Sequence, residues 1–99
     1  VEQAVIEKNL NAPRVSLEDL NKNIRNIEIV KHVSFTGQIL RWAVITTMNG
    51  YAVTGKPSCA VCQANDDKEI GEKIAIDNAR NELWGLMGYA LKEKLHHGY

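Results

Sequence analysis

A tight turn between two strand-like segments constrains the fold of this chain more than any other feature. Asn49-Gly50 joins residues 38–48, which are rich in β-branched and aromatic types, to residues 51–55. Asparagine and glycine both tolerate positive φ, so the pair predicts a type I′ hairpin turn. Apolar side chains on both faces of residues 38–48 predict that this strand lies in the centre of a sheet.

The neighbouring segments extend the hairpin into a meander. Residues 27–35 carry apolar side chains at alternate positions, which is typical of a half-buried strand, and Thr36-Gly37 supplies a turn. Lys56-Pro57 ends the return strand, because proline has no N–H to donate to a ladder. Residues 58–64 form a loop or a short further strand.

A short helix is expected before the sheet. Ser16 is a predicted helix cap, and Leu17, Leu20, Ile24 and Ile27 follow it with helical spacing. This helix should therefore run from residue 16 to about residue 26.

A long helical segment is expected after the sheet. It opens at residues 65–67, where acidic side chains favour the exposed amides of a first turn, and its apolar stripe covers residues 70–95. Gly85 and Gly88 each cost roughly 1 kcal/mol relative to alanine, which predicts a bend or break just after Trp84. The predicted fold class is α+β: an antiparallel β-meander packed against carboxy-terminal helices, with a short amino-terminal helix.

Length and charge limit the range of functions. The 99 residues predict one domain, residues 16–99, preceded by an arm, residues 1–15, that packs on a neighbouring copy. A chain this short buries only about two-thirds of its unfolded surface, so we expect a homo-oligomer. Twelve basic residues balance twelve acidic ones, which argues against nucleic acid as a partner. No apolar run reaches the roughly 18 residues of a membrane span, so no membrane partner is expected.

No group of residues has the spacing of a catalytic or metal site. Cys59-x-x-Cys62 lacks the second pair that structural zinc needs, and no thioredoxin-like βαβ pattern surrounds it. Nothing in the sequence places His32 against a nucleophile. The acidic group of Asp66, Asp67 and Glu69 lacks the alternating oxygen ligands and the central glycine of a calcium loop. We therefore expect a protein without enzyme activity, metal or cofactor.

The remaining chemistry is aromatic and basic, which suits a nucleotide-like ligand. Tyr51 follows the hairpin turn and offers a ring on which a base stacks, while cations meet phosphates. The same side chains would serve equally well as core and solvated rim. The predicted ligand-binding residues are Tyr51, Arg41, Thr54, Lys56, Ser58, Lys73, Asn78 and Arg80.

Three stretches of the chain resemble a known phage family. They are residues 49–55 (NGYAVTG), residues 69–79 (EIGEKIAIDNA) and residues 83–91 (LWGLMGYAL). The family is the small tailed-phage protein family named after gene 49 of phage N-four and gene 66 of phage Sf-six. The resemblance covers roughly residues 25–95 and implies a phage or prophage protein made in the cytoplasm of a bacterial host, where both cysteines stay reduced thiols.

The layout is also similar to the first class of Thoeris anti-defence proteins. These are phage sponges that sequester cyclic ADP-ribose isomers, and some also hold cyclic oligonucleotides. The resemblance implies an antiparallel sheet with carboxy-terminal helices, dimers or higher oligomers, ligand held between subunits, and Tyr51 as the aromatic that stacks on the base. Lys56-Pro57 and Val61-Cys62 differ from that pattern, so residues 56–65 are the expected place of altered specificity.

Three functions follow as hypotheses. The first is a non-enzymatic sponge that binds a host immune cyclic nucleotide and leaves it intact. The second is an interaction module whose helical surface binds and inhibits a host protein. The third, nucleic-acid binding, is disfavoured by the charge balance.

Overall fold

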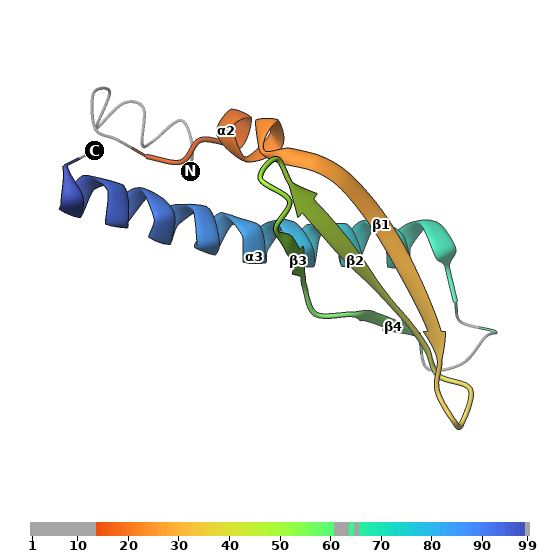
Figure 1. The fold of residues 1–99 in the computed structure, drawn as a ribbon. Coiled ribbons are helices and arrows are strands. Elements are labelled where there is room, and N and C mark those ends of the chain that lie inside the picture. Colours follow the sequence, from red (N-terminus) through yellow and green to blue (C-terminus); the bar gives the residue numbers. More distant parts are fainter. Residues whose placement is uncertain (1–13, 61–63, 65, 99) are drawn as a thin grey trace.

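The computed structural model describes residues 14–60, 64 and 66–98, so most of the predicted arm lies outside the described residues. The elements are α2 (Leu17–Lys22), β1 (Ile24–Val33), β2 (Ile39–Thr47), β3 (Ala52–Thr54), β4 (Ser58–Ala60) and α3 (Lys68–His97). In Figure 1, α3 runs along one face of a four-stranded sheet, and α2 sits near one end of that sheet. This architecture confirms the predicted α+β fold with an antiparallel meander.

Strand β2 is the centre of the sheet, as predicted. It pairs antiparallel with β1 along one edge and with both β3 and β4 along the other. Residues 55–57 separate β3 from β4 and stand opposite only two residues of β2, Trp42 and Ala43. This three-against-two arrangement is a bulge in the outer strand, and it turns residues 55–57 away from regular pairing.

The hairpin at Asn49-Gly50 forms, but the predicted type I′ turn is wrong. Gly50 has φ +90°, whereas no non-glycine residue in the described part of the chain has positive φ. The Thr47 amide donates to the Tyr51 carbonyl oxygen (2.8 Å), and the Gly50 amide donates to the Thr47 carbonyl oxygen (3.0 Å). This is the three-residue loop with a glycine bulge. The Asn49 side-chain oxygen accepts from the Tyr51 amide (3.0 Å), so Asn49 stabilises the loop without positive φ.

The amino-terminal helix is capped as predicted but is shorter. Ser16 and Asp19 form a reciprocal capping box, and the helix ends at Lys22 instead of near residue 26. A bulge at Arg25 explains the difference, because the register shifts between Ile24 and Asn26. The bulge reverses the side-chain alternation, so Ile24 and Ile27 both pack on the core from a strand although they are three residues apart. Their spacing imitates a helix.

Helix α3 is continuous, and the predicted break after Trp84 is wrong. Asp67 caps its first turn by accepting from the Ile70 amide (3.1 Å), and Gly98 ends it with φ +77°. Gly85 and Gly88 lie inside without positive φ. They cost helix propensity, but no capping residue or proline accompanies them to stop the helix. Among the described residues, neither α2 nor α3 has an apolar stretch of membrane-spanning length.

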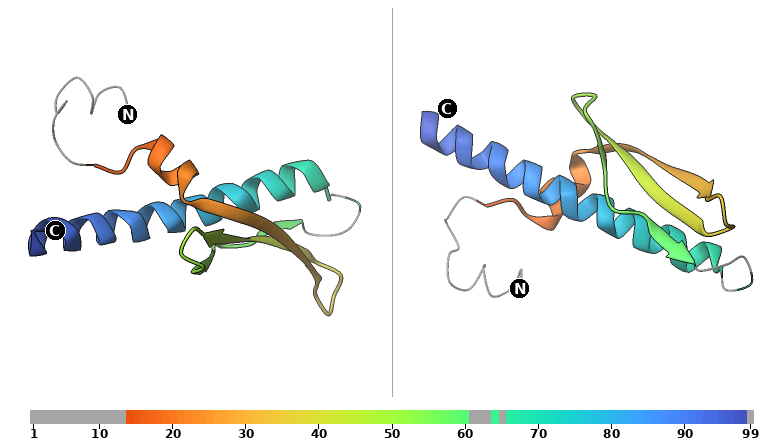
Figure 2. Two further views of the ribbon diagram at one scale, coloured as in Figure 1. Left: turned by 45° about the horizontal axis from the view of Figure 1, so that its top comes forward. Right: turned by 90° about the horizontal axis from the view of Figure 1, so that it is seen from below.

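The core lies between α3 and one face of the sheet. It is small, and α2 contributes one residue to it. Its buried members are Leu20, Ala43, Ile45, Ala75, Ala79 and Leu83. Every buried residue of α3 lies at or before Leu83, so the second half of the helix extends past the sheet, as both views in Figure 2 show.

Candidate functional site

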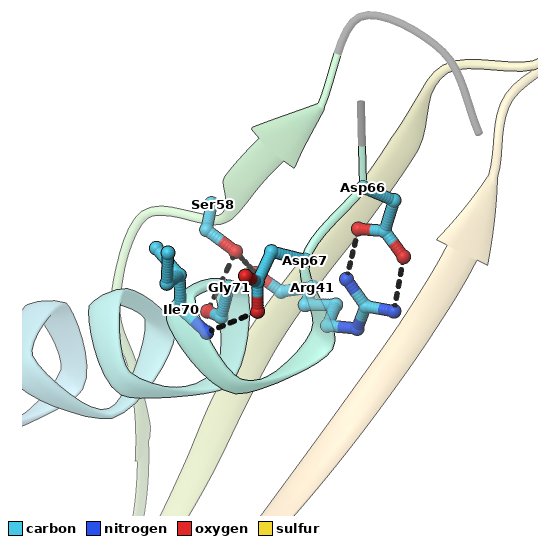
Figure 3. Close-up of polar contacts among 6 residues, drawn as sticks. All are labelled: Arg41, Ser58, Asp66, Asp67, Ile70 and Gly71. Atoms are coloured by element: carbon cyan, nitrogen blue, oxygen red, sulfur yellow. Dashed lines mark hydrogen bonds and ion pairs between the residues drawn. The ribbon is translucent and has the colours of Figure 1, made fainter. Parts of the chain in front are cut away.

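Arg41, predicted to contact ligand, holds α3 against the sheet. The residue is 5% exposed, and its guanidinium forms a bidentate ion pair with Asp66, just before α3. Arg41 Nη2 donates to Asp66 Oδ2 at 2.7 Å, and Nη1 donates to Oδ1. Figure 3 shows the two groups face to face at the entrance to the helix. The fold uses both of Arg41's outer nitrogens.

Ser58, another predicted ligand contact, is also part of this junction. The side chain is buried, and its hydroxyl donates to the Gly71 carbonyl oxygen at 2.8 Å (Figure 3). A Cβ on Gly71 would lie 3.1 Å from Arg41 Nη1 and 3.4 Å from Ser58 Oγ. Glycine at residue 71 therefore lets the first turn of α3 approach β2 and β4 closely.

Asn78 fixes the middle of α3 to the strand bulge. Its side-chain nitrogen donates to the Lys56 carbonyl oxygen at 2.9 Å. A Cβ on Gly55 would lie 2.6 Å from the Asn78 carbonyl oxygen and nearer still to the backbone of Ala79. The bulge and the helix backbone are thus in direct contact, and the Lys56 side chain is left exposed.

Lys73 and Arg80 are the two predicted cations that the structure brings together. Both line an open depression of about 440 Å³ on the side of α3. Lys73 is exposed and Arg80 is half-buried, and the Arg80 Nε atom has no hydrogen-bond partner in the described part of the chain. Three carboxylates, Glu69, Glu72 and Asp77, line the same depression, so its charge is mixed.

Tyr51 lies at a different place, on the rim of an apolar groove. The groove encloses about 160 Å³ between the hairpin turn and the second half of α3. Its lining is Asn23, Thr47, Asn49, Tyr51, Leu83, Leu86, Met87 and Ala90. Tyr51 is 60% exposed, so its ring is accessible. Among the residues that the structure describes, no lysine or arginine belongs to this lining.

The structure therefore distributes the predicted residues over several surfaces. Thr54 pairs with Val44, which places it on the sheet face away from α3. Lys56 and Asn78 line a shallow depression on the side of the helix. The groove residues on α3 were predicted only as a helical stripe, because their contact with the turn depends on the path of α3 beyond the sheet. Within residues 14–60, 64 and 66–98, no three acidic, histidine or cysteine side chains gather as a metal site requires.

The family comparison decides what kind of protein this is. The model of the Phage protein (N4 Gp49/phage Sf6 gene 66) family matches residues 15–95. The chain belongs to this phage family. No curated protein and no solved structure matches it.

The residues that carry the family resemblance lie where the outer strand meets α3. Gly55, Gly71 and Asn78 make the close contacts described above, and Ala79 is fully buried. The Gly50 turn positions the outer strand. Packing in this chain therefore accounts for these parts of the motif, whereas the exposed Tyr51 ring is not explained by packing.

The Arg41–Asp66 pair predicts acid sensitivity. A hydrogen bond from the Arg41 side chain is the main reason that the pKa of Asp66 lies below its usual 3.8. A carboxyl whose pKa is lower in the folded state adds stability above the unfolded pKa, and that stability is lost as pH falls through the folded value. We expect Asp66→Asn to lower the melting temperature at pH 7 and to flatten the decline of stability below about pH 4.

Thermal melts of wild type and Asp66→Asn over an acidic pH series measure this effect. Part of the slope should remain in the variant, because a hydrogen bond from the Ser16 backbone amide lowers the pKa of Asp19 as well. Equal slopes in the two proteins would show that the ion pair does not contribute to acid sensitivity.

Proposed function

We propose that this phage protein is a sponge that binds a host immune cyclic nucleotide in the bacterial cytoplasm and leaves it intact. The observation that carries the proposal is the exposed Tyr51 ring beside an apolar groove. A base can stack with one face on the exposed aromatic ring and bury its other face against the apolar side chains of the groove. The side-chain nitrogens of Asn23 and Asn49, also in the groove lining, provide donors for base edges.

The groove accounts for the base but not for the phosphates. Its volume is about 160 Å³, below the 300–1,000 Å³ of typical ligand pockets, so the rest of a cyclic nucleotide extends outside it. Because no cation of the described residues lines the groove, we assign the phosphate contacts to cations of a second copy. Lys56 and Lys73 are the exposed cations of the predicted set, and the half-buried Arg80 is the third candidate.

Ligand retention tests the proposal directly. The purified protein is incubated with cyclic ADP-ribose isomers or cyclic oligonucleotides, separated from free ligand, and denatured by heat. Mass spectrometry of the released material then distinguishes the outcomes. Intact ligand in stoichiometric amount supports the sponge, altered ligand indicates an enzyme, and absence of any retained ligand contradicts the proposal.

Substitution of Tyr51 separates binding from folding. We expect Tyr51→Ala to weaken ligand affinity by about 1–3 kcal/mol, the range for loss of base stacking, while the melting temperature changes little because the ring is mostly exposed. Tyr51→Phe keeps the stacking surface and should retain affinity. Isothermal titration calorimetry measures both.

Tyr89→Ala is the matched control for this experiment. Tyr89 is 68% exposed on α3 and is not part of the groove lining. Equal loss of affinity in Tyr51→Ala and Tyr89→Ala would show that the ligand does not bind in the groove. A large drop in melting temperature for Tyr51→Ala would give the ring a structural role.

A second function is favoured by the exposed part of α3. Beyond the sheet this helix presents Trp84, Tyr89 and Leu95 to solvent, and exposed aromatic and leucine side chains on a helix are typical anchors for a partner protein. As an interaction module, the protein would inhibit a host protein through this surface. A stoichiometric host protein that is captured by wild type and lost with Trp84→Ala would favour this function over the sponge.

A further inference from the structure

The face of the sheet away from α3 is apolar and uncovered by the described residues. Cross-strand register places Val30 beside Trp42, Glu28 beside Val44, and His32 beside Leu40 on this face. Along β2, the odd-numbered residues from Ile39 to Thr47 are buried and face the helix. Neither view in Figure 2 shows a described element over the other face. We call this surface the outer face.

The composition of the outer face differs from that of a solvated sheet. An antiparallel sheet with one face in water usually has polar side chains there, whereas β2 presents Leu40, Trp42 and Val44. All three are half-buried, and none of them packs against the buried core. A partly exposed apolar patch flanked by polar residues is typical of an interaction site.

From its symmetry, we infer that the outer face binds the outer face of a second copy. The Val30–Trp42 pair lies at the centre, and Glu28 and His32 lie two residues to either side of Val30 on β1. A two-fold axis that crosses the strands at this centre reverses their direction in the second copy. It stacks Trp42 on Trp42, and it places each Glu28 opposite the His32 of the other copy.

This arrangement makes the surface complementary to itself in its polar groups. Each copy contributes one carboxylate and one imidazole, which form two equivalent contacts, as an isologous dimer requires. Leu40 and Val44 exchange places in the same way. Sheets packed face to face cross at about 30°, so contacts are closest at the centre, where Trp42 lies.

The alternative two-fold axis, parallel to the strands, matches less well. It would lay β1 of one copy over β3 and β4 of the other. The residues of those strands on the outer face are Ala52, Thr54 and Cys59, which offer Glu28 and His32 no charged partner. The pairing of the Glu28 carboxylate with the His32 imidazole therefore selects the axis across the strands.

The available area indicates a weak dimer. A surface that is three strands wide and as long as β2 covers about 400 Å² on each copy. This is roughly half of the area that a standard interface buries per partner. We expect dissociation in the micromolar range, which concentration-dependent methods resolve. This inference is independent of the proposed ligand, because the Tyr51 groove lies on the α3 side of the sheet.

Sedimentation velocity over a broad concentration series tests the dimer, with Trp42→Gln and Trp84→Gln as a matched pair. We expect Trp42→Gln to weaken dimerisation at least about ten-fold, and Trp84→Gln, on the exposed side of α3, to leave it unchanged. In a Trp84→Phe background, Trp42 is the remaining tryptophan of the chain, and its fluorescence should shift to the blue as concentration rises.

A charge exchange tests the geometry. Glu28→Lys should weaken the dimer up to about five-fold, and the double variant Glu28→Lys with His32→Glu should recover it. A wild type that stays monomeric at every concentration overturns the inference, as does a dimer lost with Trp84→Gln but not with Trp42→Gln. Failure of the double variant to recover would exclude the proposed axis. Ligand retention by a Trp42→Gln monomer would keep the Tyr51 groove as the base site but would overturn the assignment of the phosphate contacts to a second copy.

Discussion

Gly55→Ala should destabilise the protein by about 3 kcal/mol or more, at the upper end of the cost of overpacking. The new methyl group would lie 2.6 Å from the Asn78 carbonyl oxygen and closer to two further backbone atoms of α3. Backbone atoms inside a helix have no rotamer to change, so the helix must move away from the sheet. For a domain of this size, the melting temperature should fall by roughly 12 °C or more.

Gly88→Ala is the matched control, because it makes the same chemical change in open space. No atom of the described part of the chain lies within 4 Å of a Cβ at Gly88, which is inside α3 and has no positive φ. Alanine there should stabilise the protein by up to about 1 kcal/mol through helix propensity. The two glycine variants should therefore shift stability in opposite directions.

Urea denaturation of wild type, Gly55→Ala and Gly88→Ala measures both changes in the free energy of unfolding. If Gly55→Ala proved as stable as wild type, the close approach of the bulge and α3 would be wrong. In that case, the packing explanation for the family motif would fail with it. A destabilised Gly88→Ala would show instead that something covers this part of the helix in solution.

The sequence predicted the elements better than their ends, and the reasons are local. The alternation in residues 38–48 identified the central strand because β2 is covered on its α3 face and half-buried on the other. The end of α2 was missed because the bulge at Arg25 gives Ile24 and Ile27 a helical spacing. Two glycines suggested a break in α3, but a helix stops where a residue adopts the cap geometry, as Gly98 does.

The candidate site was less predictable than the fold. Residue type alone does not tell whether an arginine meets a ligand or a carboxylate of its own chain. Arg41 and Asp66 are 25 positions apart, and only the path of the chain before α3 brings them together. Tyr51 could be chosen from the sequence, because a residue directly after a tight turn stays near the surface. Its groove could not, because the groove depends on where α3 passes the turn.

Leu20→Ala tests how one buried side chain holds a short helix in place. Leu20 is 1% exposed and is the one buried residue of α2. Its removal leaves a cavity where α2, β2 and α3 meet, and deletions of this kind cost about 2–5 kcal/mol. A helix of six residues has little stability of its own, so α2 should detach from α3 when its anchor is lost.

Leu17→Ala supplies the contrast, because the same substitution in the same helix should cost little. Leu17 is 50% exposed, and alanine's higher helix propensity offsets part of the small loss of burial. Both leucines fit a helical stripe in the sequence, so only the docked position of α2 gives them different energies. Chemical denaturation reports the global cost, and amide hydrogen exchange of residues 17–22 reports detachment. Similar losses for the two variants would mean that α2 packs through a different face, and the present arrangement of α2 on α3 would then be wrong.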